Sequence, residues 1–85
     1  MKLKDTLVIN NSGLVLDTKT GNSFTTNPIG IEIIRMLMDG KSAFEIKTQI
    51  MLLYRMDEEL FENDFDNLVD VLIKHKLIEQ FVEKK

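Results

Sequence analysis

Residues 21–34, with the sequence Gly-Asn-Ser-Phe-Thr-Thr-Asn-Pro-Ile-Gly-Ile-Glu-Ile-Ile, contain the point at which the chain changes from strand to helix. Phe24 stands among polar Ser and Thr neighbours, which is the pattern of a half-buried strand. Asn27 is a favourable helix N-cap, and Pro28 follows at the first helical position, where a missing N–H costs nothing. These residues predict a strand that ends at Thr26 and a helix that begins at Pro28.

The residues before this junction predict two more strands. Apolar side chains alternate at residues 7–9 and again at 14–16. Residues 10–13 (Asn-Asn-Ser-Gly) and 17–22 (Asp-Thr-Lys-Thr-Gly-Asn) have the composition of tight turns. One-sided alternation suits an antiparallel sheet with one face on a core. The predicted meander has strands near residues 5–10, 13–17 and 22–26.

The residues after the junction predict three helices, near residues 28–39, 43–54 and 58–75. Gly40 ends the first helix as a left-handed cap. Ser42 and Glu45 form a capping box that opens the second helix. Asp57 caps the third helix, whose first turn is acidic and therefore favours the positive end of the helix dipole. Strands followed by helices, in blocks, indicate an α+β fold.

Apolar residues at helical spacing predict the core of this fold. The apolar residues near the C-terminus, Leu77, Ile78, Phe81 and Val82, are expected to form a tail that covers it. Side chains expected to be largely buried are Ile33, Leu37, Ile46, Ile50, Phe65, Val69 and Leu72.

Composition limits the class of protein. The 85 residues are enough for one domain, residues 1–85. With no cysteine, disulfides and thiolate chemistry are excluded. No apolar run approaches the ~18 residues of a membrane helix, and the N-terminus lacks a secretory signal. We therefore expect a cytoplasmic protein that does not enter a membrane.

The sequence offers no set of side chains for catalysis. His75 is the one histidine, and without a second histidine or a cysteine it cannot build an ordinary zinc site. Its place in the last turn of a helix suits a cation near the negative end of the dipole. The serines lack a nucleophile motif and a partner base. We expect a protein that is not an enzyme and that carries no metal or cofactor.

The third predicted helix has an unusually wide apolar surface. Its apolar residues between 58 and 76 cover an arc of roughly 220°, whereas a surface helix needs a stripe of only about 100°. The helix is therefore either buried between several elements, or one margin of the arc lines a groove for a partner. Residues 57–70 also contain seven acids and no Lys or Arg.

Four segments together resemble the PqqD-like family, also called RiPP recognition elements. In that family a strand is followed by Asn-Pro and a helix, then by a turn of the form "L.dGk.s", and near the end by "fLxxLxxxGLI". The resemblance spans roughly residues 7–78. The matching residues are Gly21 to Thr26, Asn27 to Ile34, Met38 to Ser42, and Leu68, Val69, Leu72, Leu77 and Ile78.

Two positions depart from the family pattern. Ile34 stands where the family often has Trp, and an apolar Ile at this position is compatible with a packed core. Lys76 stands where the family often has Gly, and a left-handed cap disfavours Lys. The end of the third helix can therefore differ by one residue.

The resemblance implies a winged-helix-like fold whose third strand is a sheet edge. In the family, a leader peptide adds to that edge as a fourth strand, in the cleft beside the third helix. The edge carries no Pro or charged residue to block such pairing. The implied partners are a precursor peptide and a modifying enzyme, such as a radical or ATP-dependent maturase. The implied peptide-binding residues are Asn22, Ser23, Phe24, Thr25, Thr26, Phe61, Asp64, Leu68 and Val71, which leaves Phe65, Val69 and Leu72 to face the core.

Two other functions remain open. A structural or dimerisation subunit would bury the wide apolar arc against a second copy. The peptide-binding hypothesis instead predicts a monomer or weak dimer. A winged-helix DNA-binding module would use the third helix as its recognition helix. The acids of residues 57–70 speak against nucleic acid, because phosphate neutralisation dominates DNA affinity.

Overall fold

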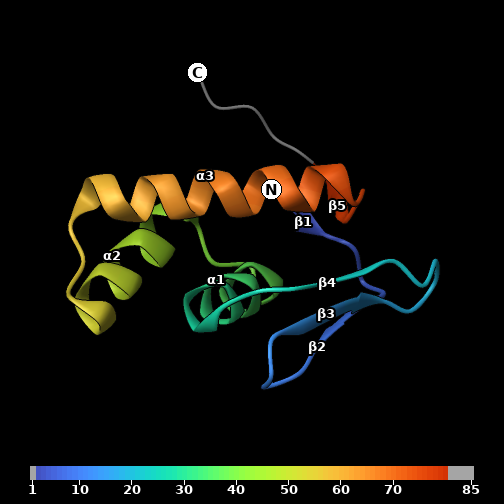
Figure 1. Cartoon of the computed structure of the whole chain (residues 1–85). Coiled ribbons are helices and arrows are strands. Elements are labelled where there is room, and N and C mark those ends of the chain that lie inside the picture. The colour runs from blue at the N-terminus through green and yellow to red at the C-terminus, as the bar shows by residue number, and fades with distance from the viewer. Residues whose placement is uncertain (1, 81–85) are drawn as a thin grey trace.

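The structure is a computed structural model that describes residues 2–80 (Figure 1). The three predicted strands and three predicted helices are confirmed, with ends that differ by at most two residues from those expected. The α+β fold is therefore confirmed within the described residues. The elements in chain order are β1 (Lys2–Leu3), β2 (Leu7–Ile9), β3 (Leu14–Asp17), β4 (Ser23–Thr25), α1 (Pro28–Met38), α2 (Ala43–Tyr54), α3 (Glu58–Lys74) and β5 (Ile78–Gln80).

The main sheet is an antiparallel meander with the order β2-β3-β4. Val15 at its centre pairs with Ile9 on one side and Phe24 on the other. Val15 is fully buried, and Ile9 and Phe24 pack against the core, so this face of the sheet turns inward. The strand β4 is an edge of this sheet, as predicted, and it runs below the long helix α3 in Figure 1.

The buried carboxylate of Asp17 organises the turn that leads into β4. One of its oxygens accepts hydrogen bonds from the Thr6 hydroxyl (2.6 Å) and the Lys19 N–H (3.0 Å), and the other accepts one from the Thr20 hydroxyl (3.1 Å). The Asp17 backbone N–H donates to the Asn22 carbonyl at 2.8 Å. The three hydrogen bonds to the carboxylate lower the pKa of Asp17, and the bond from Thr6 has the largest effect. The ionised carboxylate therefore holds the turn between β3 and β4 in place and ties it to Thr6, while the Asp17 backbone pairs with Asn22 just before β4.

The predicted helix caps are all present. Asn27 and Asp57 accept hydrogen bonds from the backbone N–H groups of Gly30 and Leu60, which opens α1 and α3. Both hydrogen bonds of the Ser42 capping box form at the start of α2. Gly40 has a φ of +85°, in the left-handed region that a helix-ending glycine adopts easily.

The core lies between the inner face of the sheet and the three helices. Five of the predicted core residues are buried, but the prediction was wrong for Phe65 and Val69, which are only half-buried. The reason is the rotation of α3, which points Phe61, Leu68 and Leu72 inward. The buried hydrophobic residues are Leu3, Leu7, Val15, Ile33, Ile34, Met36, Leu37, Ile46, Ile50, Phe61, Leu68, Leu72 and Leu77.

A second, two-stranded sheet was not predicted. The strands β1 and β5 pair antiparallel, and Leu3 and Leu77 are buried there, so the two ends of the described chain lie together (Figure 1). Leu77 covers the core as predicted and Ile78 packs against it, whereas Phe81 and Val82 lie outside the described residues. No helix among residues 2–80 is long and apolar enough to cross a membrane.

The end of α3 keeps a left-handed residue although it is a lysine. Lys76 has a φ of +58°, and its N–H donates to the Ile73 carbonyl at 2.9 Å. The next N–H, of Leu77, donates to the Leu72 carbonyl at 2.9 Å. This pair of bonds holds Lys76 in a conformation that glycine adopts more easily.

Candidate functional site

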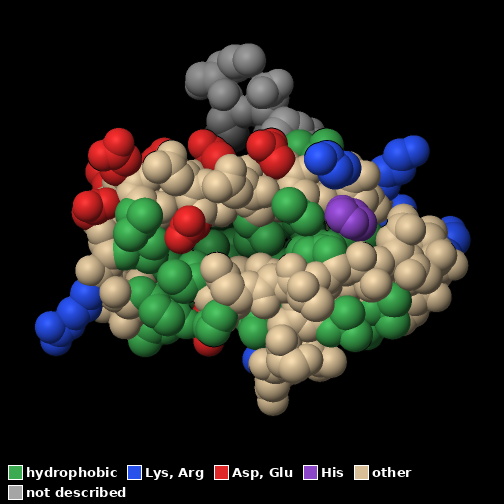
Figure 2. All heavy atoms as spheres, viewed as in Figure 1, with side chains coloured by type: hydrophobic (Ala, Val, Ile, Leu, Met, Phe, Trp, Pro, Cys, Tyr) green, Lys and Arg blue, Asp and Glu red, His purple; other side chains and the backbone are tan. Residues whose placement is uncertain are grey.

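A groove opens between β4, the start of α1 and the middle of α3. Figure 2 shows its apolar floor between the two rims that these elements form. Its volume of about 250 Å³ is below the ~300–1,000 Å³ of typical small-molecule pockets. The groove therefore suits a few side chains of a longer ligand better than a whole small molecule. Its lining residues are Phe24, Thr25, Thr26, Asn27, Ile29, Gly30, Ile33, Asp64, Asn67, Leu68 and Val71.

The backbone of β4 forms one rim and turns its free polar groups outward. The Thr26 N–H donates to the Gly13 carbonyl at 2.9 Å, and the Asn22 carbonyl accepts from Asp17 at 2.8 Å, so both groups face β3. Backbone groups of a strand alternate in direction, so those of Ser23 and Thr25 must face away from β3. An extended chain beside β4 can pair with the N–H and C=O groups of these two residues.

Two glycines allow Thr26, just after β4, to pack closely against its neighbours: Gly13 in the turn before β3 and Gly30 in α1. A Cβ atom on Gly13, whose φ is +98°, would lie 2.3 Å from the Thr26 carbonyl oxygen. A Cβ atom on Gly30 would lie 1.9 Å from the Thr26 hydroxyl oxygen. Neither distance is possible between real atoms. A larger residue at Gly13 would shift the Thr26 backbone, and a larger residue at Gly30 would displace the Thr26 side chain. Both glycines thus allow the present position of Thr26 at the rim of the groove.

The opposite rim comes from one side of α3. Asp64, Asn67 and Val71 follow each other at intervals of three and four residues, which places them on one face of a helix. Leu68 lines the groove as well but is only 8% exposed, so it forms part of the floor and of the core. Phe61, which is 3% exposed, lies beneath the surface and stacks on Phe65 with 5.5 Å between ring centres.

Six of the nine residues implied by the family resemblance line this groove, and three do not. Asn22 and Ser23 are exposed just before the groove, and Phe61 is buried below it. Asn67 also lines the groove but was not among the predicted residues: its spacing from Asp64 and Val71 places it on the same helix face, but its residue type does not mark it as part of a groove. The six that line it are Phe24, Thr25, Thr26, Asp64, Leu68 and Val71.

His75 closes one end of the groove. Its ring lies 5.2 Å from the ring of Phe24, measured between centres, and its Nδ1 lies 3.1 Å from the Val71 carbonyl oxygen. The histidine therefore connects the end of α3 to β4, which is more than the helix-end charge expected from the sequence. Residues 2–80 contain no group of three or more His, Cys, Asp or Glu side chains that could hold a metal ion.

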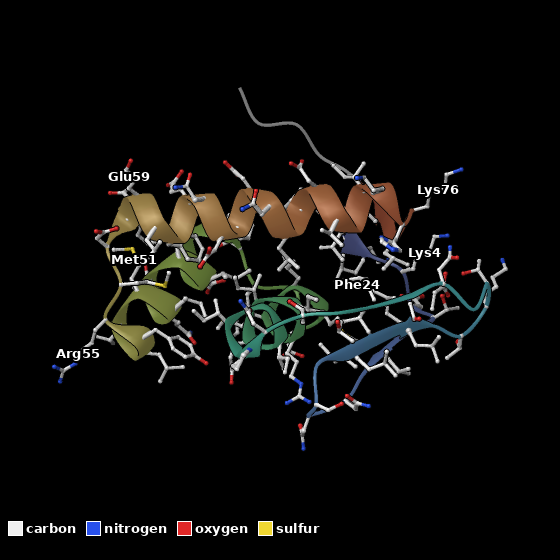
Figure 3. All side chains as sticks on the ribbon, in the orientation of Figure 1. Lys4, Phe24, Met51, Arg55, Glu59 and Lys76 are labelled. Atoms are coloured by element: carbon white, nitrogen blue, oxygen red, sulfur yellow. The ribbon has the colours of Figure 1, made fainter. Side chains whose placement is uncertain are left out.

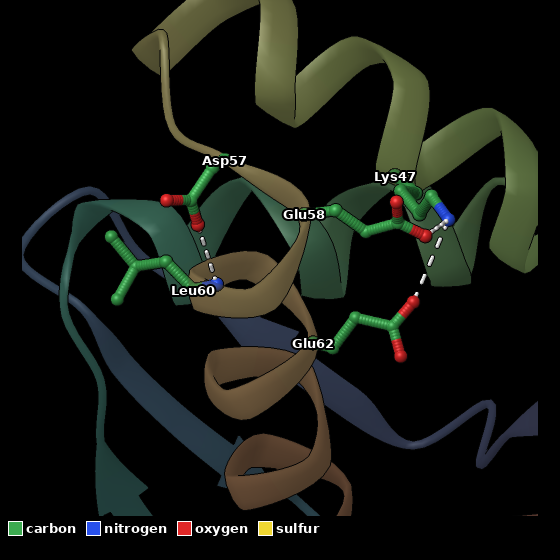
Figure 4. A network of polar contacts seen from close by, with 5 residues as sticks. All are labelled: Lys47, Asp57, Glu58, Leu60 and Glu62. Carbon is green, nitrogen blue, oxygen red and sulfur yellow. Dashed lines mark hydrogen bonds and ion pairs between the residues drawn. The ribbon is translucent and has the colours of Figure 1, made fainter.

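Two acids at the start of α3 have a structural partner. Lys47 of α2 forms ion pairs with Glu58 and, at 3.5 Å, with Glu62 (Figure 4). Hydrogen bonding and attraction from Glu58, aided by Glu62, raise the pKa of Lys47. These contacts join α2 to α3. Asp64, by contrast, has no hydrogen bond or ion pair within residues 2–80.

Two comparisons with known proteins show what this chain resembles. The family model described as coenzyme PQQ synthesis protein D (PqqD) matches residues 13–78. A solved structure, described as TbiB1 in complex with the TbiA(beta) leader peptide, is similar in fold with a TM-score of 0.81. The two chains are 27% identical, and the similarity covers 98% of this chain and 100% of that one. No curated protein sequence matches the chain.

Proposed function

Because this chain belongs to the PqqD family, we propose that it binds the leader segment of a ribosomally made precursor peptide and presents it to a separate modifying enzyme. TbiB1, which resembles this chain over its whole length, was solved in complex with a leader peptide. The proposed role is non-enzymatic, so chemistry on the precursor belongs to the modifying enzyme, for example a radical or ATP-dependent maturase. We also propose that the chain acts as a monomer or weak dimer.

The observation that carries the proposal is the free edge of β4 beside a groove with an apolar floor and polar rims. The outward N–H and C=O groups of Ser23 and Thr25 supply main-chain hydrogen bonds of the kind that β-augmentation uses for affinity. The groove supplies pockets for every second side chain of the added strand. We propose that the peptide also contacts Asn67, which lines the groove, and Asn22, which lies just before it. The other proposed contact residues are Ser23, Phe24, Thr25, Thr26, Asp64, Leu68 and Val71.

Phe61 has a different role in this proposal. Because it is 3% exposed, it cannot touch a peptide without a rearrangement of the core. We propose instead that it supports the groove from below, by packing next to Phe65 and holding α3 at its present rotation. Substitution of Phe61 should therefore change stability before it changes peptide affinity.

The test uses precursor peptides encoded by genes next to that of this chain. A fluorescently labelled leader segment is titrated with the purified protein, and anisotropy reports binding. We expect saturable binding by the leader and none by the remaining core segment of the same precursor. A leader that binds only to the modifying enzyme, and never to this chain, would show that the proposed function is wrong.

A second arm tests the non-enzymatic role. The precursor is incubated with this chain alone, with the modifying enzyme alone, and with both, and its mass is followed. We expect the mass to change only when the enzyme is present, and to change faster with both proteins. Modification by this chain alone would contradict the proposed role.

A further inference from the structure

The two ends of the groove carry opposite charge. Figure 2 shows that Asp and Glu side chains gather over one end of this face, whereas Lys side chains and the histidine gather at the other. The groove itself contains an acid, Asp64, toward the first end. The single histidine, His75, marks the second end, beside Phe24.

The basic end is built from two separate parts of the chain. Lys4 is fixed there because its backbone N–H donates to the Leu77 carbonyl at 3.0 Å. Lys76 follows His75 directly, and Figure 3 shows Lys4, Lys76 and Phe24 at the same end of the molecule. Neither lysine forms an ion pair with the described side chains of residues 2–78, although the Lys4 charge helps to lower the pKa of Asp17. Both lysines therefore add positive charge to this end of the groove.

The acidic end is only partly neutralised by a nearby cation. Lys47 pairs with Glu58 and Glu62, which leaves Asp64 without a basic partner in the described residues. Arg55, at the C-terminal end of α2, points away from the molecule in Figure 3. A basic side chain of a ligand would thus meet an unpaired carboxylate in the groove.

The spacing of the two ends sets the spacing of charges in the ligand. Asp64 and His75 are eleven residues apart on α3 and its cap, which is about 16 Å at 1.5 Å per residue. An extended chain covers this length in about five residues at 3.3 Å each. Only every second side chain of a strand faces α3, so the matching charges must stand four or six residues apart.

The direction of the ligand follows from the sheet. The main sheet is antiparallel throughout, and antiparallel pairs are slightly more stable than parallel ones. The strand β4 runs from the His75 end, where Phe24 lies, toward the Asp64 end, where Thr26 and Asn27 lie. An antiparallel peptide therefore begins beside Asp64 and ends beside His75, Lys4 and Lys76.

We propose that the groove selects peptide strands by charge order: a basic side chain first, an apolar one in the middle, and an acidic one four or six residues after the basic one. The inference rests on the proposed function and names the class of leader segment that the groove accepts. The apolar middle side chain lies over Leu68 and Val71, and the basic one reaches Asp64.

Two synthetic peptides with the same composition test this order. The Lys-first peptide is Thr-Lys-Thr-Ile-Thr-Glu-Thr, the Glu-first peptide exchanges its two charged residues, and both have blocked ends. Affinity is measured by amide NMR shifts of the labelled protein. We expect the Lys-first peptide to bind about tenfold more tightly at low salt, as two modest ion pairs replace two repulsions. At about 1 M salt, where the screening length is about 3 Å, the preference should shrink.

Variants of α3 connect the preference to the groove. Asp64→Lys should abolish the preference for the Lys-first peptide, because each of the two peptides then makes one attractive and one repulsive contact. The control Asp66→Lys makes the same charge change on an exposed position of α3 that lies outside the groove, and should leave the tenfold ratio intact. An unchanged ratio in Asp64→Lys would overturn the assignment of the basic side chain.

The outcomes separate this inference from the proposed function. Equal affinities, or tighter binding of the Glu-first peptide, overturn the charge order. Failure of both peptides to bind at millimolar concentration overturns it too, because charge order and strand pairing would then not suffice for recognition. If the natural leader still binds in either case, the proposed function stands without this inference.

Discussion

Two flanks of α3 differ in what they contact, although they lie on one helix. The core flank, Phe61, Leu68 and Leu72, is buried against the sheet and the other helices. The groove flank, Asp64, Asn67 and Val71, faces β4 across an open groove. One helix can therefore support both folding and recognition, because a rotation of less than a quarter turn separates the two flanks.

The core flank should dominate stability. Leu72 is 0% exposed, so Leu72→Ala should lower the free energy of unfolding by about 2–5 kcal/mol, the usual cost of truncating a buried leucine. Leu60→Ala on the same helix, at a position that is 52% exposed, should change it by about 0.5 kcal/mol or less. Urea denaturation measures both. Similar losses in the two variants would contradict the separation of the flanks.

The groove flank should dominate binding. Val71→Asp puts a carboxylate into the apolar part of the groove, so leader affinity should fall at least about tenfold, since removing water from a charge is costly. Val71 is the better position to change, because Leu68 is part of the core. Fluorescence anisotropy with the labelled leader measures the effect.

Val69→Asp is the matched control for this change. Val69 is the same residue type on the same helix and is also half-buried, but it does not line the groove. Its substitution should leave leader affinity within about threefold, the scale of a surface change. Equal loss of affinity in the two variants would place the peptide elsewhere on α3.

The other rim of the groove should act through its backbone. Thr25→Pro removes an outward N–H of β4. The hydrogen bond between this N–H and the peptide is then lost, so leader binding should weaken about tenfold. Thr25→Val keeps the N–H and should bind almost normally. If the valine variant loses as much affinity as the proline variant, the side chain of Thr25 and not its backbone contacts the peptide.

The smallest effect concerns Asp17 and pH. The hydrogen bonds from Thr6, Lys19 and Thr20 lower the folded-state pKa of this carboxyl, so ionised Asp17 stabilises the fold above about pH 4. That contribution is lost as the pH falls through the folded-state pKa. The stability advantage of the natural protein over Asp17→Asn should therefore be present at pH 7 and shrink below about pH 4. Urea denaturation at several pH values measures it, and a constant advantage would contradict the role of the charge.

The sequence predicted the elements of the fold because their ends depend on local chemistry. Asn27, Ser42 and Asp57 cap helices by hydrogen bonds to residues three positions away, which short patterns reveal. The turns before β3 and β4 are equally local, since Asn10 and Asp17 bond to neighbours two to four residues away. Because both turns were predicted, the position of residues 23–25 as an edge strand was predicted as well.

Other features depend on contacts between distant residues. The pairing of β1 with β5 joins Leu3 to Ile78 through strands of two and three residues, too short to leave a pattern. The rotation of α3 was also hidden, because its apolar arc includes both Phe61, which is buried, and Phe65, which is only half-buried. Periodicity shows that an arc is apolar but not which part of it faces the core.

The candidate site was predictable to a similar degree. The family resemblance implied that β4 and α3 form it, and the groove does lie between them. Asn67 and Ile29 could not be selected, because nothing in their own residue types distinguishes a groove wall from a helix surface or a core. The closeness of His75 to Phe24 likewise requires the packing of α3 on β4.

Hydrogen exchange at the edge of β4 is the most direct test of peptide binding by strand addition. The amides of Ser23 and Thr25 face outward in the free protein, so they should exchange quickly without a ligand. Addition of the leader peptide as a fourth strand should slow the exchange of one or both of them by at least about tenfold, while Ile9 on the opposite edge of the sheet stays unchanged. Saturation with a leader that leaves both amides of β4 unprotected, or that protects Ile9 instead, would contradict peptide binding by strand addition at β4.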